Sequence, residues 1–349
     1  MPDKPTAGSE PQTGWAAFDA ALATARAELA AAAPDAATAG EAEAYLMRTA
    51  ASTLSDGFLG DHFRAGGLTR AIPTRGGPNP DYQMWHAPND AGRRSRLEGW
   101  LNASERAGVG LYTIGAGGVT LLAGYAAFDR SNVDGKGRFS LDLSADAEGP
   151  GALTLTPEHR VLLVRLLHRA PEAPACRLKL TGGAPVPALT PAMGTSEAAL
   201  ALASRNVVAG VRQFLEWSRL IGESRNRFTT PPPSIAASVQ GDPDTGYYFA
   251  AYDLGPGEWL EALIPEGVEG YWSLHAYNHW CESLPGAGVH DLSATAGPDG
   301  RIRVRIGPNV PEGLANRVDT QGRRRGVLIY RTLGETETRI PEAEVIRSF

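Results

Sequence analysis

The chain of 349 residues is poor in cysteine and lysine, and several familiar motifs are missing from its sequence. It contains two cysteines, Cys176 and Cys281, which are too few for a disulfide framework or a structural zinc cluster. It has no Gly-x-Ser-x-Gly elbow, no P-loop and no dinucleotide-binding glycine fingerprint, which argues against the commonest hydrolase, triphosphatase and dehydrogenase classes. We therefore expect no cofactor and no bound metal.

Charge and hydropathy exclude two further classes of partner. The formal net charge is −6 and no long basic block is present, so we expect no nucleic-acid binding. No apolar run reaches the roughly 18 residues that cross a membrane, and the N-terminus carries no apolar leader. A content of 42% hydrophobic and 21% charged residues is ordinary for a folded protein. We expect a soluble, cytoplasmic protein that has no membrane partner, and we leave homo-oligomer formation open.

The order of predicted elements divides the chain into four parts. These are an N-terminal tail with helices (1–65), a first β lobe (66–182), a helical connector (183–245) and a second β lobe (246–349). Helices are predicted at 15–33, 40–54 and from 195 or 196 to about 221. The apolar stripe of the third helix is expected to pack against the lobes. The clearest strands are 110–114, 139–143, 161–167, 247–252, 259–264, 271–280, 302–306 and 327–332.

The two β regions share an order of features. Asp134-Gly135 precedes one strand and Arg165 follows within an apolar run, just as Asp299-Gly300 precedes a strand and Arg331 follows. The two spacings differ by a single residue. We predict a mainly β protein with added helices, in which a duplicated antiparallel β-sandwich lobe is joined by a helical connector.

A second correspondence, between Gly124-Tyr125 and Gly270-Tyr271, assigns extra residues to the second lobe. Those residues include 278–288. Because loops on a rigid scaffold often carry function, we expect the site in this stretch, although divergence of a surface loop explains it equally well.

The densest group of functional side chains is the segment 271–283, YWSLHAYNHWCES. If this segment is a strand, its side chains alternate between two faces. One face carries Tyr271, Ser273, His275, Tyr277 and His279, and the other carries Trp272, Leu274, Ala276, Asn278 and Trp280. We expect the second, mostly apolar face to pack in the core and the first to line a pocket or the surface.

The histidines of this segment are the best candidates for acid–base chemistry. On a strand, His275 and His279 lie roughly 13 Å apart, too far to share a metal ion. A single imidazole beside Glu282 or Asp291 suits general acid–base catalysis because it titrates near neutral pH. The alternative is a hydrogen-bonded structural histidine. Cys281 is a further candidate nucleophile, but lone thiols are usually inert packing residues.

Aromatic residues gather in the second lobe, which holds six of the ten tyrosines and three of the seven tryptophans. Such rings form walls for apolar, aromatic or sugar ligands, or else they are core. Asp319 and Arg331 are candidates for a ligand clamp or a structural ion pair. A second polar and aromatic patch, which contains Asp81 and Tyr82, begins at an Asn-Pro turn in the first lobe.

Several of these segments resemble the bacterial family numbered 1214 among domains of unknown function. They are Asn79-Pro80-Asp81-Tyr82, Tyr271-Trp272, Asn278-His279-Trp280 with Glu282-Ser283, and Asn316 with Val318-Asp319-Thr320 and Gly322. The chain departs from the family at Arg317, where Trp is common, and at Cys281, where Met is common. The resemblance implies jelly-roll-like β-sandwich lobes and no established reaction. It associates the chain with bacterial catabolism of hydrophobic compounds.

The leading hypothesis is a cofactor-independent lyase, isomerase or hydrolase that acts on a small hydrophobic or aromatic oxygenated metabolite. His275 or His279 is the predicted acid–base residue, Tyr277 and Asn278 orient a substrate oxygen, and Glu282 or Asp319 positions the imidazole or Arg331. The substrate is expected to lie among Tyr271, Trp272, Tyr277 and Trp280. The alternatives are a non-catalytic module that binds a carbohydrate or apolar ligand with the same aromatic residues, and a purely structural cluster.

Overall fold

The computed structural model describes residues 14–58, 68–70, 76–88, 92, 94–114, 120–182, 195–238, 241–334 and 337–347. The chain forms two compact units, of which one contains Met1–Phe63 and Pro187–Leu215 and the other contains Arg64–Val186 and Glu216–Phe349. Both β lobes therefore belong to one unit, whereas the sequence suggested four consecutive parts. Residues 1–13 of the predicted N-terminal part and residues 183–194 of the predicted connector lie outside the described residues.

The helical unit contains α1 (Gly14–Ala32), α2 (Ala36–Phe58) and the larger part of α4 (Thr195–Gly222), close to the predicted helices. Asp35 caps α2, because its Oδ1 accepts a hydrogen bond from the Thr38 N–H at 2.8 Å. The predicted apolar stripe of α4 is buried, and its Phe214 ring lies 5.0 Å from Tyr45 of α2. Through Phe214 the stripe contacts α2 of the helical unit, and its expected packing against the lobes stays a prediction. None of the described helices has an apolar stretch long enough to cross a membrane.

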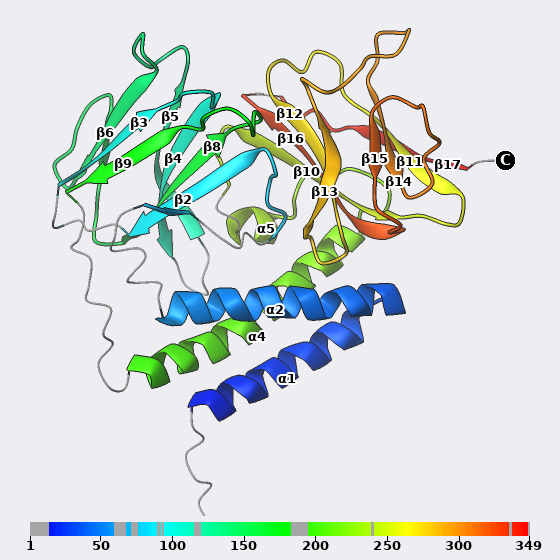
Figure 1. Ribbon diagram of the computed structural model, residues 1–349, viewed down its shortest axis with the longest axis horizontal. Helices are drawn as coiled ribbons and strands as arrows, with labels where there is room; N and C mark the ends of the chain where they lie inside the picture. The colour runs from blue at the N-terminus through cyan, green and yellow to red at the C-terminus, as the bar shows by residue number, and fades with distance from the viewer. Residues whose placement is uncertain are drawn as a thin grey trace, which may run out of the picture. The chain divides into compact units, whose positions relative to one another are not determined.

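The β unit contains two lobes, each built from two sheets (Figure 1). In the first lobe, sheet A has the strand order β1-β2-β8-β4-β5 and sheet B has the order β7-β6-β3-β9. Their bounds are β1 (Thr69–Arg70), β2 (Tyr82–Pro88), β3 (Ser95–Trp100), β4 (Arg106–Ile114), β5 (Thr120–Asp129), β6 (Arg138–Ser144), β7 (Ala152–Thr154), β8 (His159–Leu167) and β9 (Arg177–Thr181). The short helix α5 (Pro233–Ser238) precedes the second lobe in the chain.

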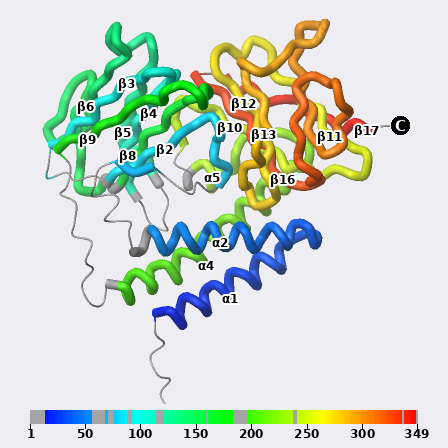
Figure 2. Tube along the Cα trace, in the orientation of Figure 1, coloured from blue at the N-terminus to red at the C-terminus, as the bar shows by residue number. Residues whose placement is uncertain are grey.

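In the second lobe, sheet C has the order β10-β16-β12-β13 and sheet D has the order β15-β14-β11-β17. Their bounds are β10 (Thr245–Asp253), β11 (Glu258–Leu263), β12 (Trp272–Tyr277), β13 (Ser283–His290), β14 (Arg303–Gly307), β15 (Arg317–Asp319), β16 (Arg325–Leu333) and β17 (Glu342–Arg347). Figure 2 traces the first lobe in cyan and green and the second in yellow to red. The protein is therefore mainly β, with sandwich-like lobes, as the sequence predicted.

The strands occupy matching places in the two lobes. Arg165 lies on β8 and Arg331 on β16, each on an inner strand, and each Asp-Gly turn precedes a strand that has a parallel neighbour. The second proposed correspondence is wrong, because Gly124-Tyr125 lies in the edge strand β5 whereas Gly270-Tyr271 directly precedes the inner strand β12. The segment 278–288 consists of a turn and most of β13. It is therefore mainly a regular strand of sheet C and not an added loop.

Each lobe has its own apolar core, and the alternation of β12 follows the prediction. Trp272, Leu274 and Ala276 point into the core of the second lobe. The opposite side of β12 carries Ser273, His275 and Tyr277, and these side chains are also buried. Their burial means that another part of the β unit covers the outward face of sheet C.

Candidate functional site

Polar side chains from the outward faces of sheets A and C meet in a buried layer between the lobes, which we call the interlobe polar layer. The segment 76–81, which leads into β2, lies against sheet C. Its backbone carbonyls accept hydrogen bonds from side chains of the layer. The layer consists of Gly77, Asn79, Asp81, Tyr82, Arg106, Tyr112, Arg165, Asp242, Tyr247, Tyr271, Ser273, His275, Tyr277 and Arg331. It joins the two motifs, one from each lobe, that the sequence singled out.

The centre of the layer is a histidine and a carboxylate from different lobes. His275 on β12 is 5% exposed, and its Nε2 lies 3.6 Å from Oδ1 of Asp81. This distance is beyond hydrogen-bond length, as catalytic contacts often are without substrate. The imidazole Nδ1 is buried and has no hydrogen-bond partner among the described residues. A buried polar atom that is left without a partner is costly, which makes this nitrogen a candidate contact for a ligand.

Burial and the facing charge act in opposite directions on the His275 pKa. Burial lowers it, because a charged imidazole is poorly solvated there, and the Asp81 carboxylate opposes this only in part, so the pKa lies below the ordinary value. For Asp81, burial acts to raise the pKa, but the facing His275 imidazole and the hydrogen bond from the Tyr271 hydroxyl outweigh it and leave the pKa lowered. At neutral pH the layer therefore holds a neutral imidazole beside an ionised carboxylate.

Tyr271 fixes the carboxylate. Its hydroxyl donates to Oδ2 of Asp81 at 2.8 Å, accepts from the Asn79 side-chain amide at 2.8 Å, and lies 2.8 Å from the Ser273 hydroxyl. Asn79 in turn accepts the backbone N–H of Asp81 at 3.0 Å. This network holds Asp81 in place through groups from both lobes. Burial raises the pKa of the Tyr271 hydroxyl well above its usual value, and the nearby Asp81 carboxylate raises it further. The hydroxyl therefore keeps its proton.

A glycine makes room for the imidazole. Gly288 on β13 is the direct cross-strand neighbour of His275. A Cβ at this position would lie 2.1 Å from the His275 Cδ2. The ring therefore lies across the backbone of β13, and any side chain at position 288 would displace it.

Arg331 is a buried cation next to this centre. Its Nη1 donates to the Tyr277 hydroxyl at 3.0 Å and its Nη2 to the Gly77 carbonyl at 2.6 Å. No carboxylate among the described residues lies within 4 Å of its guanidinium. Gly77 has a φ of +74°, and a Cβ there would lie 2.5 Å from Ile329 of β16, so only glycine allows this close approach.

The first lobe presents a matching pair. Nη1 of Arg165 donates to the Tyr112 hydroxyl at 2.9 Å, and the Tyr112 hydroxyl donates to the Gly241 carbonyl at 2.9 Å. Beside this pair, Arg106 forms a buried ion pair with Asp242 at 2.7 Å. The sequence interpretation missed Arg165, Tyr112 and Arg106 as site residues. One signal in the sequence could have identified Arg165. It is an arginine inside an apolar strand, at the position that matches Arg331.

The structure separates several residues that were expected to act together. Tyr277 has no hydroxyl proton to offer a substrate, because its hydroxyl donates to the Pro78 carbonyl at 2.8 Å and accepts from Arg331. Asn278 and Glu282 bind each other across the turn, through a side-chain contact of 3.0 Å and the Glu282 N–H at 2.9 Å. These two residues shape the turn, and neither is placed to position His275.

His279 and the two tryptophans also lie outside the centre. β12 ends at Tyr277, so His279 belongs to the turn, where its ring packs edge-on against Trp280 at 4.9 Å. Trp272 points into the core on the opposite side of β12 from His275, so the expected aromatic enclosure does not form. Of the expected enclosing residues, Tyr271 alone reaches the Asp81 carboxylate.

Two ion pairs differ from those expected. Asp319 is exposed and pairs with Arg317 at 3.1 Å on sheet D, so it forms no clamp with Arg331 on sheet C. Asp291 pairs with Arg169, whose guanidinium lies 5.0 Å from the Tyr271 ring centre. The remaining predicted ligand residues, Asp81 and Tyr82, do lie in the layer, where the Tyr82 ring meets Tyr271 edge-on at 5.9 Å.

Cys281 is unsuited to act as a nucleophile. It is buried in the turn after β12 with a φ of +56°, and burial raises the pKa of its thiol to about 12. A thiolate is the reactive form, so the side chain stays protonated near neutral pH.

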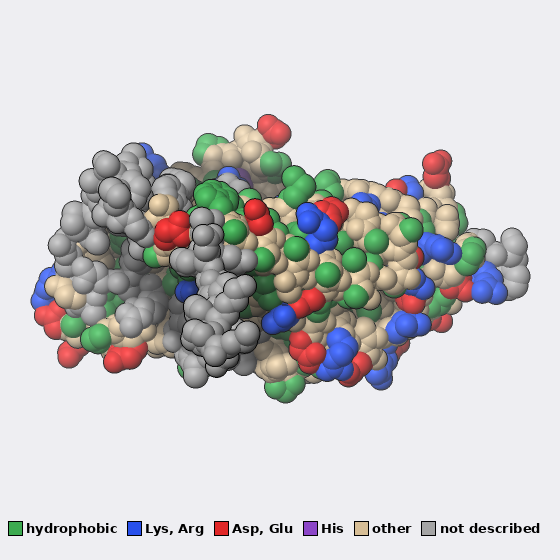
Figure 3. Space-filling view, turned by 90° about the horizontal axis from the view of Figure 1, so that it is seen from below, with side chains coloured by type: hydrophobic (Ala, Val, Ile, Leu, Met, Phe, Trp, Pro, Cys, Tyr) green, Lys and Arg blue, Asp and Glu red, His purple; other side chains and the backbone are tan. Residues whose placement is uncertain are grey.

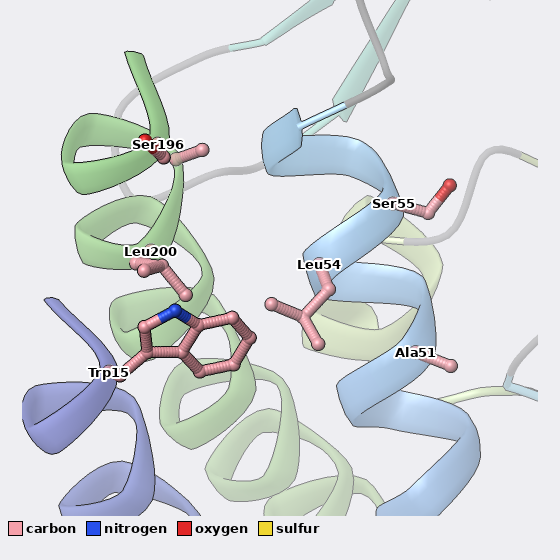
Figure 4. Close-up of a pocket in the computed structure, with 7 residues that line it drawn as sticks. Trp15, Ala51, Leu54, Ser55, Ser196 and Leu200 are labelled. Carbon is pink, nitrogen blue, oxygen red and sulfur yellow. The ribbon is translucent and has the colours of Figure 1, made fainter. Parts of the chain in front are cut away.

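A separate apolar pocket lies within the helical unit. It has a volume of about 480 Å³ and is lined by Trp15, Ala51, Leu54, Ser55, Ser196, Ala199 and Leu200. Figure 4 shows Trp15 of α1, Leu54 of α2 and Leu200 of α4 pointing toward one another. On the face shown in Figure 3, hydrophobic side chains are mixed with acidic and basic ones. The pocket suits an apolar group, but its described lining offers only two serine hydroxyls for chemistry, so the interlobe polar layer is the better candidate.

Comparison with known proteins establishes the fold and no function. No family model matches the chain, and no curated protein matches it. An uncharacterized protein from Burkholderia cenocepacia is 23% identical, with 96% of each chain covered and a TM-score of 0.83, so the chain shares its overall fold. A protein from Vibrio parahaemolyticus is 14% identical over 86% of this chain and 99% of that chain, with a TM-score of 0.47, which supports no conclusion.

Proposed function

We propose that the protein is a cofactor-independent enzyme that uses His275 as a general base on a small, hydrophobic, oxygenated metabolite. The observation that carries the proposal is the His275 imidazole, which is buried, neutral at pH 7 and beside an ionised Asp81, and whose Nδ1 has no hydrogen-bond partner among the described residues. If the Nε2–H points to Asp81, the lone pair is on Nδ1 and accepts a proton from the substrate. Structural histidines usually have both ring nitrogens occupied, which this one does not.

The other groups of the layer fit the same reaction. Asp81 stabilises the imidazolium that forms when His275 takes the proton, and Tyr271 holds Asp81 in position. The positive charge of Arg331 lies near the imidazole, where it favours negative charge that develops on a substrate oxygen. A base, an orienting carboxylate and a fixed cation together suit proton abstraction next to a carbonyl, as in isomerases and lyases.

The test compares His275→Gln with His279→Gln. Purified protein is incubated in D₂O with a panel of small aromatic and terpenoid ketones, acids and esters, and exchange of C–H for C–D or product formation is followed by NMR. We expect His275→Gln to lower turnover at least about 100-fold, the usual size of a general-base contribution, and His279→Gln to change it less than about threefold.

Two results decide against the proposal. Equal loss in the two variants would place the effect in the local fold and not in proton transfer. If the wild type binds a compound but never turns it over, and His275→Gln binds that compound with the same affinity, the alternative of a non-catalytic binding module is favoured.

The fold itself suggests a history for the site. We propose that the two lobes are jelly-roll-like copies of one ancestral lobe and that the chain is a divergent relative of the bacterial family 1214, whose members are associated with catabolism. The matching strand orders and the equivalent positions of Arg165 and Arg331 support the duplication. On this proposal, the arginine–tyrosine pairs are an inherited feature and the His275–Asp81 pair arose in one copy.

A further inference from the structure

The side of sheet A that faces the layer carries two buried donors with nothing to bind. Nη2 of Arg165 and the hydroxyl of Tyr82 have no hydrogen-bond partner among the described residues, although both atoms are shielded from solvent. Arg165 is 3% exposed. A buried cation is normally paired, because an isolated charge is expensive to remove from water. Within the part of the chain that the structure describes, no carboxylate lies within 4 Å of the Arg165 guanidinium.

The two donors come from neighbouring strands and from the same face of sheet A. Met84 on β2 is the cross-strand partner of Arg165 on β8, so Tyr82, two residues earlier, is the diagonal neighbour of Arg165 on the same face. Burial raises the pKa of the Tyr82 hydroxyl beyond its usual range, and among the charged groups around it Arg165 acts in the opposite direction. The hydroxyl therefore keeps its proton and can donate it.

We infer that Arg165 and Tyr82 form a carboxylate-binding subsite, so that the substrate is a small monocarboxylic acid; this inference rests on the proposed function of His275. Asp81 directly precedes Tyr82, and the Tyr82 ring meets Tyr271, so the subsite adjoins the acid–base centre. A carboxylate held by a guanidinium N–H and a hydroxyl places the neighbouring carbons toward that centre.

Charge and shape favour a monoanion with an apolar body. The nearby carboxylate of Asp242 is already paired with Arg106 and would repel a second negative charge, which disfavours a phosphate dianion. On β8, Leu163 and Leu167 flank Arg165 on the same face, and both are buried. The subsite thus suits an aromatic or short aliphatic acid.

The test measures ligand stabilisation of the full chain. Thermal unfolding is followed with benzoate, 4-hydroxybenzoate, hexanoate, the corresponding primary amides, and inorganic phosphate, and the best ligand is titrated by calorimetry. We expect carboxylates to stabilise the protein and the amides and phosphate to have little effect. Tyr82→Phe should weaken carboxylate binding about 10- to 100-fold, as expected for loss of a hydrogen bond to a charged group. Arg165→Met should abolish it.

Tyr82→Phe is the decisive variant, because it removes only a hydroxyl that makes no hydrogen bond to the described residues. Its stability without ligand should equal or exceed that of the wild type. Thr49→Val is the matched control, since it removes another buried, unpartnered hydroxyl, on α2, and should leave carboxylate binding unchanged.

The outcomes separate this inference from the proposed function. The carboxylate subsite would be overturned if amides or phosphate stabilised the wild type as much as carboxylates do. It would also be overturned if carboxylates stabilised Tyr82→Phe as much as they stabilise the wild type. Turnover of a neutral compound that needs His275 but not Tyr82 would also overturn it while the proposed function stands. Carboxylate binding that needs Tyr82, with no His275-dependent turnover, would support the subsite and refute the enzyme.

Discussion

A histidine that is buried without a full set of partners links folding to proton uptake. In the unfolded chain the His275 pKa has its ordinary value near 6.5, and in the folded chain burial lowers it. As the pH falls through 6.5, the unfolded chain takes up a proton that the folded chain resists. The free energy of unfolding therefore decreases from pH 7 toward pH 5. Asp81, whose folded pKa is lowered from 3.8, adds a second loss only below about pH 4.

The corresponding prediction is that His275→Gln removes part of the stability loss between pH 7 and pH 5. Urea unfolding of the wild type and of His275→Gln at both pH values measures it. For activity, the acid limb of kcat/KM is expected below pH 6.5, because the neutral imidazole is the base. An unchanged pH dependence in His275→Gln would show that its titration is not linked to folding.

At the scale of the elements, the pairing of β12 with β13 sets the position of the imidazole. Gly288 stands opposite His275, and a methyl group there would overlap the ring. We predict that Gly288→Ala lowers turnover at least about 10-fold, because a displacement of about 1 Å from the reacting position is enough to cost a large factor in rate. The strand itself should persist, because alanine fits its backbone conformation.

Gly124→Ala on β5 is the matched control, since the nearest atom to its added Cβ lies 3.4 Å away. Turnover measured beside thermal unfolding distinguishes positioning from folding. A Gly288→Ala variant that keeps full activity would show that the ring does not need its observed place.

Local pattern predicted the long helices, about half of the strands and one face of the site. The helices begin and end within a few residues of the predicted positions, and the alternation of β12 separated Trp272 from His275 correctly. The strand was predicted too long, because Asn278 and Cys281 close a tight turn that apolar periodicity does not reveal. The partners of His275 were also missed, because Asp81 is far away in sequence and only the packing of the lobes brings it near.

At the scale of the whole β unit, buried ion pairs hold the interlobe polar layer together. Arg106 on β4 binds Asp242, which precedes β10, and the hydroxyl of Tyr125 donates to the same carboxylate at 2.8 Å. The buried Arg169 bridges two half-buried carboxylates, Glu105 and Asp291. The Arg106–Asp242 pair joins the first lobe to the connector, and the Arg169–Asp291 pair joins the first lobe to the second, whereas Glu105 belongs to the first lobe itself. Because such charges are removed from water, they tolerate the loss of one partner poorly.

A double-mutant cycle on Arg106 and Asp242 tests whether this pair couples the lobes. Arg106→Met should lower the free energy of unfolding by about 3–5 kcal/mol, since it leaves the buried Asp242 carboxylate without its cation. Asp242→Asn should cost less, because Arg106 keeps its second ion pair, with Asp244. The double variant should lose less than the sum of the two, by at least about 1–2 kcal/mol. The exposed pair Arg96 and Asp142 within sheet B is the control, and its variants should cost no more than about 1 kcal/mol.

Urea unfolding should also become less cooperative in Arg106→Met. Tryptophan fluorescence and far-ultraviolet circular dichroism report on different parts of the chain, so separated midpoints indicate that the lobes unfold independently. Because the acid–base centre draws His275 from one lobe and Asp81 from the other, loosening the lobes should lower turnover even though neither residue is changed. Additive losses in the cycle together with coincident midpoints would mean that the lobes are held by their other contacts, and activity should then survive the substitution.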